Sequence, residues 1–98
     1  MEKRTSPRFP WVAEVVVTLL PALEEASRPG QVLKAETENI AKGGIGILLD
    51  RPIVAGTVVR CDIAVSDQGV HIPTLLKVRW NNFLEGKKRY RLGLKFLL

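Results

Sequence analysis

Apolar and polar residues alternate along most of this chain, and this alternation limits the fold more than any other feature. Successive side chains of a β-strand point to opposite faces, so a period of two indicates a strand with one buried face. The sequence predicts six such strands, at about residues 12–20, 31–39, 45–49, 57–65, 72–80 and 90–96. The best helix candidate, 22–27, is only about a turn and a half long.

The turns predicted between the strands favour antiparallel neighbours. Proline and glycine punctuate the chain at Pro21, Pro29-Gly30 and 52–56, and further turns are predicted at 67–69 and 81–88. Six short strands would leave exposed edges unless the sheet closed on itself. We therefore expect an all-β fold, a small six-stranded antiparallel β-barrel with little or no helix.

The same alternation predicts which side chains form the core. Lone Cys61 is expected to face inward as a small apolar residue, and Trp80 is expected in the core rather than on a binding surface. The predicted inward residues are Ala13, Val15, Val17, Leu19, Leu33, Ala35, Thr37, Ile45, Ile47, Leu49, Val59, Cys61, Ile63, Val65, Leu76, Val78, Trp80, Tyr90, Leu92, Leu94 and Phe96.

Length and charge narrow the class of protein further. A chain of 98 residues is one domain, here an arm at 1–11 and a barrel at 12–98. The net charge of 15 − 10 = +5 favours anionic partners. No apolar stretch approaches the ~18 residues of a membrane span. A single cysteine excludes an intrachain disulfide, so a reducing cytoplasm is the expected location.

Two short segments carry the chemistry. Arg4 and Arg8 flank Pro7 on an arm that cannot be a regular helix, and arginine forks suit phosphate oxygens and the guanine edge. The segment 39–44, Asn-Ile-Ala-Lys-Gly-Gly, is a polar turn in which the backbone of Gly43 and Gly44 can approach a ligand closely. Together they predict a site for a phosphate-bearing, guanine-containing ligand between an arm and a barrel rim.

The order and spacing of these segments resemble the PilZ domain. Its motif pair is R-x-x-x-R before the first strand and [D/N]-x-S-x-x-G between the second and third strands, and residues 90–96, Tyr-Arg-Leu-Gly-Leu-Lys-Phe, resemble its last strand. The resemblance implies a bacterial receptor for cyclic di-GMP. It implies that Arg4 and Arg8 hold the ligand from one side, and that the second motif lines the other side through Asn39, Ala41, Gly43 and Gly44.

Ala41 departs from the pattern, because the family has serine there. A missing neutral hydroxyl bond is worth about 0.5–1.5 kcal/mol, so Ala41 predicts about two- to tenfold weaker binding. The weaker site candidates are Lys3, Lys42, Arg79 and Arg91. Lys3 stands where the family varies in a way linked to the number of bound ligand molecules.

Each feature also has a plainer interpretation. The arginines could belong to a solvated tail, the glycine turn could be a simple hairpin with a positive φ, and Lys42 could be solvated. Two other functions stay open: a PilZ-like interaction domain that binds no nucleotide, and a nucleic-acid-binding barrel of the OB type. Nucleic acid is disfavoured because only 6% of residues are aromatic and the alternation puts Trp80, Tyr90 and Phe96 inside, which leaves few exposed stacking platforms.

Catalysis and metal binding are not expected. His71 is predicted in a hairpin loop and Cys61 in the core, so they form no metal set, and no nucleophile has a nearby base. The ligand expected is cyclic di-GMP itself, with no further cofactor. A protein partner or a fused domain is expected to read the signal, and the apolar Leu97-Leu98 end leaves homodimerisation open.

Overall fold

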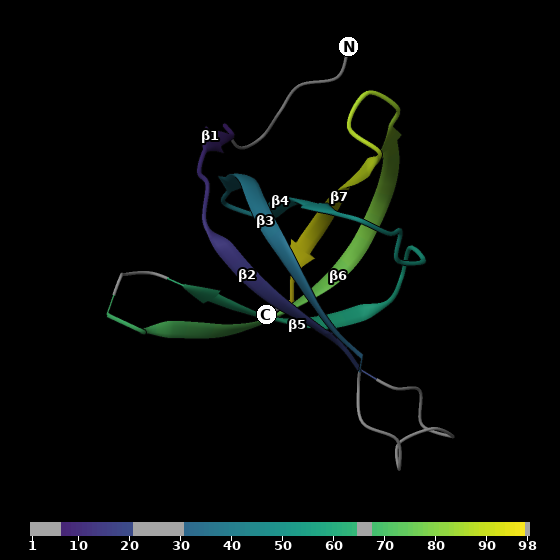
Figure 1. The fold of residues 1–98 in the computed structure, drawn as a ribbon. Coiled ribbons are helices and arrows are strands. Elements are labelled where there is room, and N and C mark those ends of the chain that lie inside the picture. The colour runs from purple at the N-terminus through teal and green to yellow at the C-terminus, as the bar shows by residue number, and fades with distance from the viewer. Residues whose placement is uncertain (1–6, 21–30, 65–67, 98) are drawn as a thin grey trace.

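The computed structural model shows antiparallel strands wrapped into a barrel (Figure 1). It describes residues 7–20, 31–64 and 68–97, and none of these is helical. The predicted helix candidate at 22–27 and the turn at Pro29-Gly30 lie outside the described residues. The strands are β1 (Phe9–Pro10), β2 (Glu14–Leu19), β3 (Val32–Ala41), β4 (Gly44–Leu49), β5 (Val58–Ala64), β6 (His71–Leu84) and β7 (Arg89–Phe96).

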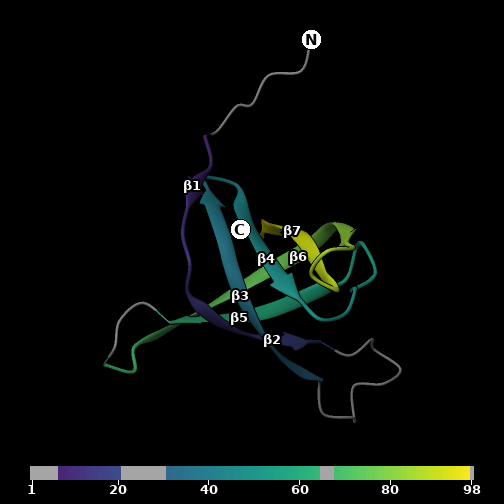
Figure 2. The ribbon, with the colours of Figure 1, turned by 45° about the horizontal axis from the view of Figure 1, so that its top comes forward.

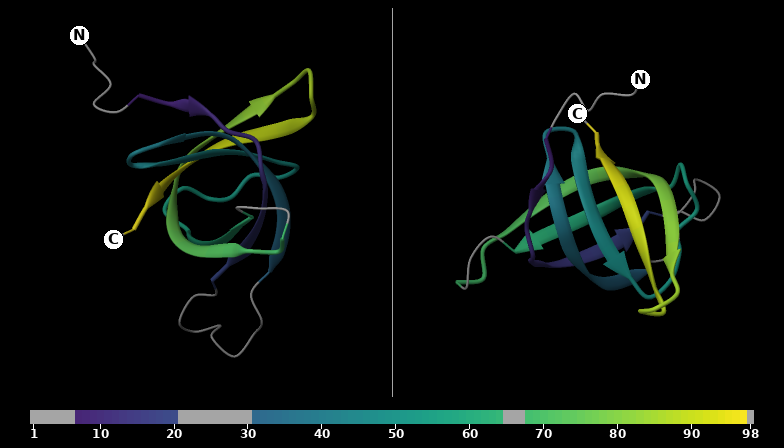
Figure 3. Two further views of the ribbon diagram at one scale, coloured as in Figure 1. Left: turned by 90° about the vertical axis from the view of Figure 1, so that its left-hand side faces the viewer. Right: turned by 90° about the horizontal axis from the view of Figure 1, so that it is seen from above.

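Six of these strands close into a ring (Figure 3). Their order is β3-β2-β5-β6-β7-β4, and β4 pairs back onto β3, so each barrel strand has two neighbours and no full edge is left open. The all-β barrel predicted from the alternation is confirmed. The short β1 is an addition: it pairs with the end of β3, so that the arm runs along the barrel there (Figure 2).

The core is the one that the alternation predicts, with few exceptions. Cys61 is fully buried, while the predicted inward residues Ala13, Leu19, Tyr90 and Phe96 are only partly buried. Ile53, in the loop after β4, joins the core although no strand pattern marks it. The predicted inward residue Val65 lies outside the described residues. The confirmed core residues are Val15, Val17, Leu33, Ala35, Thr37, Ile45, Ile47, Leu49, Val59, Cys61, Ile63, Leu76, Val78, Leu92 and Leu94.

β6 is longer at both ends than the sequence predicts. The turn expected at 81–88 begins only after Leu84, and His71 is the first residue of the strand rather than part of a loop. Asn81 is held in the ladder because its side chain pairs with the backbone of Ile53. Its Oδ1 accepts from the Ile53 N–H at 2.9 Å and its Nδ2 donates to the Ile53 carbonyl at 2.8 Å. These bonds override the turn preference of asparagine.

Two β-bulges break the alternation. The register between β3 and β4 shifts after Thr37, which leaves Glu38 as an extra residue, and the register between β6 and β7 shifts in the same way at Arg79. A bulge places two residues opposite one, so the side chains beyond it change face. The prediction that Trp80 packs in the core was therefore wrong, and its side chain is 37% exposed.

The buried hydroxyl of Thr37 ties the segment between β1 and β2 to the barrel. Its Oγ1 accepts a hydrogen bond from the Ala13 N–H at 2.8 Å and donates one to the Trp11 carbonyl at 2.7 Å. Trp11 also donates its backbone N–H to the Glu38 carbonyl at 3.0 Å and packs against the core. The end of the arm at Trp11 and the segment that follows it, up to Ala13, are therefore fixed to the barrel.

Candidate ligand-binding site

One row of paired residues crosses five strands on the outside of the barrel. Pro10 of β1 pairs with Asn39 of β3, which pairs with Gly46 of β4. Gly46 pairs with Gly93 of β7, and Gly93 pairs with Trp80 of β6. The two central positions have no side chain, while those on either side carry a ring, an amide and an indole. The row is therefore low in the middle and raised at its ends.

Both glycines are required by this packing. A Cβ on Gly46 would lie 2.9 Å from the Asn39 Oδ1, and one on Gly93 would overlap the Trp80 ring. The Asn39 amide and the Trp80 indole thus lean over the bare backbone between them. Any larger residue at Gly46 or Gly93 would push one of them away.

A hollow of about 470 Å³ opens above this row. Its volume falls within the ~300–1,000 Å³ of small-molecule sites. Arg8 and Arg91 contribute positive charge, and Glu38 contributes negative charge. The lining residues are Arg8, Pro10, Glu38, Asn39, Gly46, Trp80 and Arg91.

The arm reaches the hollow through Arg8. One Nη of Arg8 donates to the Asn39 Oδ1 at 2.9 Å, between residues 31 positions apart in the chain. Pro10 sits directly beside Asn39 in the strand pairing, so the arm forms one wall of the hollow. The Arg8 side chain is exposed, which leaves its other donors open to solvent or to a ligand.

Arg91, which also lines the hollow, is held by Glu38. The Arg91 Nε lies 2.7 Å from one Glu38 carboxylate oxygen and an Nη lies 3.0 Å from the other, a two-pronged ion pair. The hydrogen bond to Glu38 and the carboxylate charge raise the pKa of Arg91 above its usual value. The pair spans β4, because Glu38 is on β3 and Arg91 is on β7.

Comparison with known proteins identifies the family to which this barrel belongs. A family model of the PilZ domain matches residues 2–98. The chain belongs to the PilZ family. PilZ domains are a receptor family for cyclic di-GMP and are generally non-catalytic. A search of curated proteins found no match.

Solved structures share the fold of this PilZ domain. The Bacillus subtilis inhibitor of motility (MotI/DgrA) matches with a TM-score of 0.70 and 19% identity over 100% of this chain and 44% of its own. The K. pneumonia MrkH–c-di-GMP complex matches with a TM-score of 0.68 and 14% identity over 100% and 45%. The PilZ domain of Escherichia coli YcgR with c-di-GMP matches with a TM-score of 0.62 and 14% identity over 98% and 79%. This chain thus spans less than half the length of the first two proteins.

Only part of the predicted site lies at the hollow. Arg8, Asn39 and the weaker candidate Arg91 line it. Arg79 is exposed in the bulge of β6 and is not a lining residue. Arg4 and Lys3 lie outside the described residues.

The other predicted residues form the tip of the β3–β4 hairpin rather than the wall of the hollow. Ala41 and Gly44 pair across the tip, with Lys42 and Gly43 as the two turn residues. Neither glycine has the positive φ expected of a simple hairpin turn, and a Cβ on Gly44 would overlap the Leu94 carbonyl. Gly44 is therefore required by the close approach of β7, whereas Gly43 has open space around it.

The sequence did not predict four of the residues that line the hollow, namely Pro10, Glu38, Gly46 and Trp80. Two of them follow from the bulges, which no alternation pattern reveals. A signal was nevertheless present, because an isolated glycine inside a strand pattern indicates a bulge or a close backbone approach. Gly46 and Gly93 are such glycines, and both mark the hollow.

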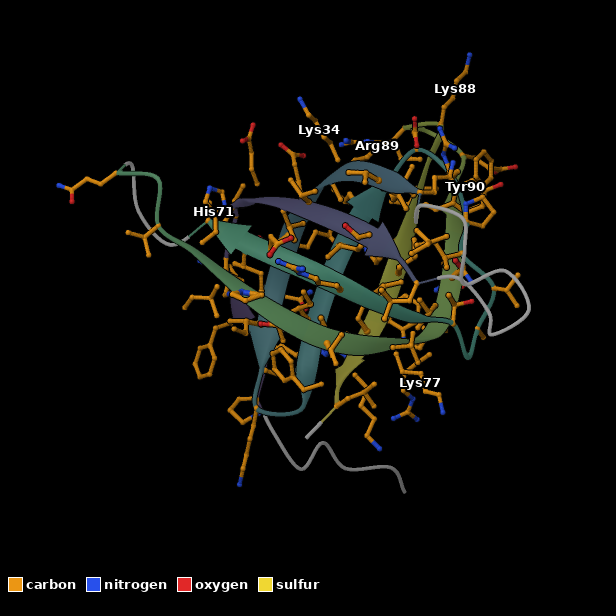
Figure 4. All side chains as sticks on the ribbon, turned by 90° about the horizontal axis from the view of Figure 1, so that it is seen from below. Lys34, His71, Lys77, Lys88, Arg89 and Tyr90 are labelled. Carbon is orange, nitrogen blue, oxygen red and sulfur yellow. The ribbon has the colours of Figure 1, made fainter. Side chains whose placement is uncertain are left out.

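The described residues show no other centre of chemistry. Among them no group of three His, Cys, Asp or Glu side chains could hold a metal. Burial raises the pKa of the Cys61 thiol to about 12, with the nearby Asp62 charge adding to the effect. His71 begins β6 far from Arg89 and Tyr90 (Figure 4). No helix within the described ranges is long and apolar enough to cross a membrane.

Proposed function

We propose that this PilZ domain binds cyclic di-GMP in the hollow between the arm and the barrel, and that binding repositions the arm. The observation that carries the proposal is the contact between Arg8 and Asn39. The two sequence motifs, 31 positions apart, meet there through a 2.9 Å hydrogen bond. Arg4 would approach from the same arm, four residues before Arg8.

The lining residues suit a dinucleotide with two phosphates and two guanines. The guanidinium of Arg8 can bond phosphate oxygens or the O6/N7 edge of guanine. The Asn39 amide has a donor and an acceptor for a base edge. The partly exposed Trp80 offers an aromatic face next to bare glycine backbone, where a base can stack.

Ligand binding would change the arm because it would compete with the contact that now holds Arg8. A ligand oxygen or base edge at Asn39 replaces the Arg8–Asn39 hydrogen bond, and the arm closes over the ligand instead. Such a ligand-driven change of a chain segment is a common basis of switching. A partner protein or a fused domain would read the new position of the arm.

Calorimetric titration with cyclic di-GMP tests the proposal, with GMP and cyclic di-AMP as controls. We expect micromolar or tighter binding, weakened about ten- to a hundredfold in Arg8→Ala or Arg4→Ala, because each loses a hydrogen bond to a charged group. Arg51→Ala is the matched control, since it removes the same charge from an exposed arginine that does not line the hollow. Absence of heat with the wild-type domain at tens of micromolar ligand would refute the proposal.

The second candidate function is a PilZ interaction domain that acts without nucleotide. It is favoured by Ala41, where the family has serine, and by the internal pairing of Arg8 with Asn39 and of Arg91 with Glu38. A partner captured equally well with and without cyclic di-GMP would support this candidate over the first.

A further inference from the structure

We infer that Glu38 lowers the affinity of this site for phosphate by occupying Arg91, so that a ligand and the Glu38 carboxylate compete for one guanidinium. The inference rests on the proposed function of the hollow and assigns to it a built-in anionic competitor. The bulge in β3 creates this arrangement, because Glu38 is the extra residue of that bulge and lines the hollow.

The ion pair is the most closely fitted one in the described part of the chain. Both carboxylate oxygens of Glu38 are used, at 2.7 and 3.0 Å, whereas the other ion pairs there have single contacts or one shared oxygen at 3.1–3.3 Å. The Glu38 side chain is 22% exposed and that of Arg91 is 42% exposed. A phosphate would have to replace a two-pronged carboxylate to reach the same donors.

The net charge of the hollow also predicts that Glu38 weakens the binding of an anionic ligand. The described lining residues carry two positive charges, from Arg8 and Arg91, and one negative charge, from Glu38. A ligand with two phosphates meets a hollow of net charge +1, and neutral glutamine in place of Glu38 would raise this to +2. A carboxylate beside a phosphate disfavours binding through repulsion as well as through competition.

β3 offers a matched control two residues earlier. Glu36 also faces outward and pairs across β4 with an arginine of β7, Arg89, at 3.3 Å. That pair does not line the hollow. Arg89 lies on the side of the barrel that also carries Lys34 (Figure 4). Glu36→Gln therefore changes the net charge by the same amount without changing the hollow.

The test compares Glu38→Gln with Glu36→Gln by calorimetric titration with cyclic di-GMP. Glutamine keeps the shape and one acceptor for Arg91, so we expect Glu38→Gln to bind about three- to tenfold more tightly than wild type. Glu36→Gln should change the affinity by less than about twofold. Weaker or unchanged binding in Glu38→Gln would overturn the inference, because it would mean that Glu38 helps the ligand or does not meet it.

A double substitution shows whether Glu38 acts through Arg91. We expect Arg91→Gln alone to weaken binding, and addition of Glu38→Gln to restore less affinity than the same substitution adds when Arg91 is present, because only the repulsion by the carboxylate is then relieved. Wild-type affinity in Arg91→Gln, or an equal gain from Glu38→Gln with and without Arg91, would overturn the competition.

A second probe separates this inference from the proposed function. Inorganic pyrophosphate is a simpler anion that offers phosphate oxygens without guanine or ribose, and its binding can be followed on the Arg91 Nε–H signal by NMR. Suppose that pyrophosphate binds more tightly to Glu38→Gln and that no variant binds cyclic di-GMP. This result would support the competition between Glu38 and phosphate for Arg91, and it would refute the proposal that this domain binds cyclic di-GMP. If neither probe distinguishes Glu38→Gln from Glu36→Gln, the inference is wrong.

Discussion

The Thr37 hydroxyl is expected to hold the arm to the barrel, and Thr37→Val tests this directly. The side chain is 1% exposed, accepts from the Ala13 N–H at 2.8 Å and donates to the Trp11 carbonyl at 2.7 Å. Valine has nearly the same shape but leaves that donor and that acceptor without their partner. Each lost bond is worth about 0.5–1.5 kcal/mol and an unpaired group costs more, so we expect a loss of about 2–3 kcal/mol.

Urea unfolding followed by circular dichroism measures this loss. A loss of 2–3 kcal/mol corresponds to a fall in Tm of about 8–24 °C for a domain of this size. Thr18→Val is the control, because the Thr18 hydroxyl has no hydrogen bond among the described residues. Hydrogen exchange adds a local measurement, in which the Ala13 amide should exchange faster in Thr37→Val. If Thr37→Val is as stable as Thr18→Val and the Ala13 amide stays protected, the hydroxyl does not anchor the arm.

Two further substitutions address the floor of the hollow and the core. Gly93→Ala should displace the Trp80 ring, change its fluorescence and cost about 1–3 kcal/mol, whereas Gly86→Ala, which has open space for a Cβ, should do neither. The Cys61 thiol has a pKa raised to about 12 from 9.0, so the folded state keeps its proton where the unfolded state loses it. Stability should fall between about pH 9 and 12, by at most about 1.4 kcal/mol per pH unit from this group, and Cys61→Ala should lack that part of the slope. An identical pH dependence in Cys61→Ala would show that other groups cause the fall.

The alternation predicted the barrel well because most strands keep one face buried along their whole length. Residues such as Val15, Val59 and Leu92 face the core as a period of two requires. The ends of the strands were harder to predict from the sequence, since they depend on partners far away in the chain. Asn81 pairs with Leu92 in the β6–β7 ladder, and its side-chain amide is satisfied by Ile53, 28 positions earlier in the chain.

The site was harder to predict because it exists where the alternation fails. The alternation with period two predicts that Trp80 faces the core on the same side as Val78. The extra residue Arg79 in the bulge turns Trp80 to the outside instead. The extra residue Glu38 has the same effect on Asn39 in β3. A pattern of period two cannot reveal a bulge, because a bulge is a change in the pairing between strands.

The two bulges and the two strand glycines are best understood as one construction. Each bulge turns a large polar or aromatic side chain outward, Asn39 on one side and Trp80 on the other, and the row between them is empty because Gly46 and Gly93 pair there. Neither the bulges nor the glycines alone would make a hollow. Without the glycines, the outward side chains of Asn39 and Trp80 would meet other side chains. Without the bulges, the glycines would lie between residues that face the core. Glycine in adjacent, paired positions of two central strands weakens a sheet. Ligand binding in the hollow, as proposed above from the contact of Arg8 with Asn39, would give a reason for this cost.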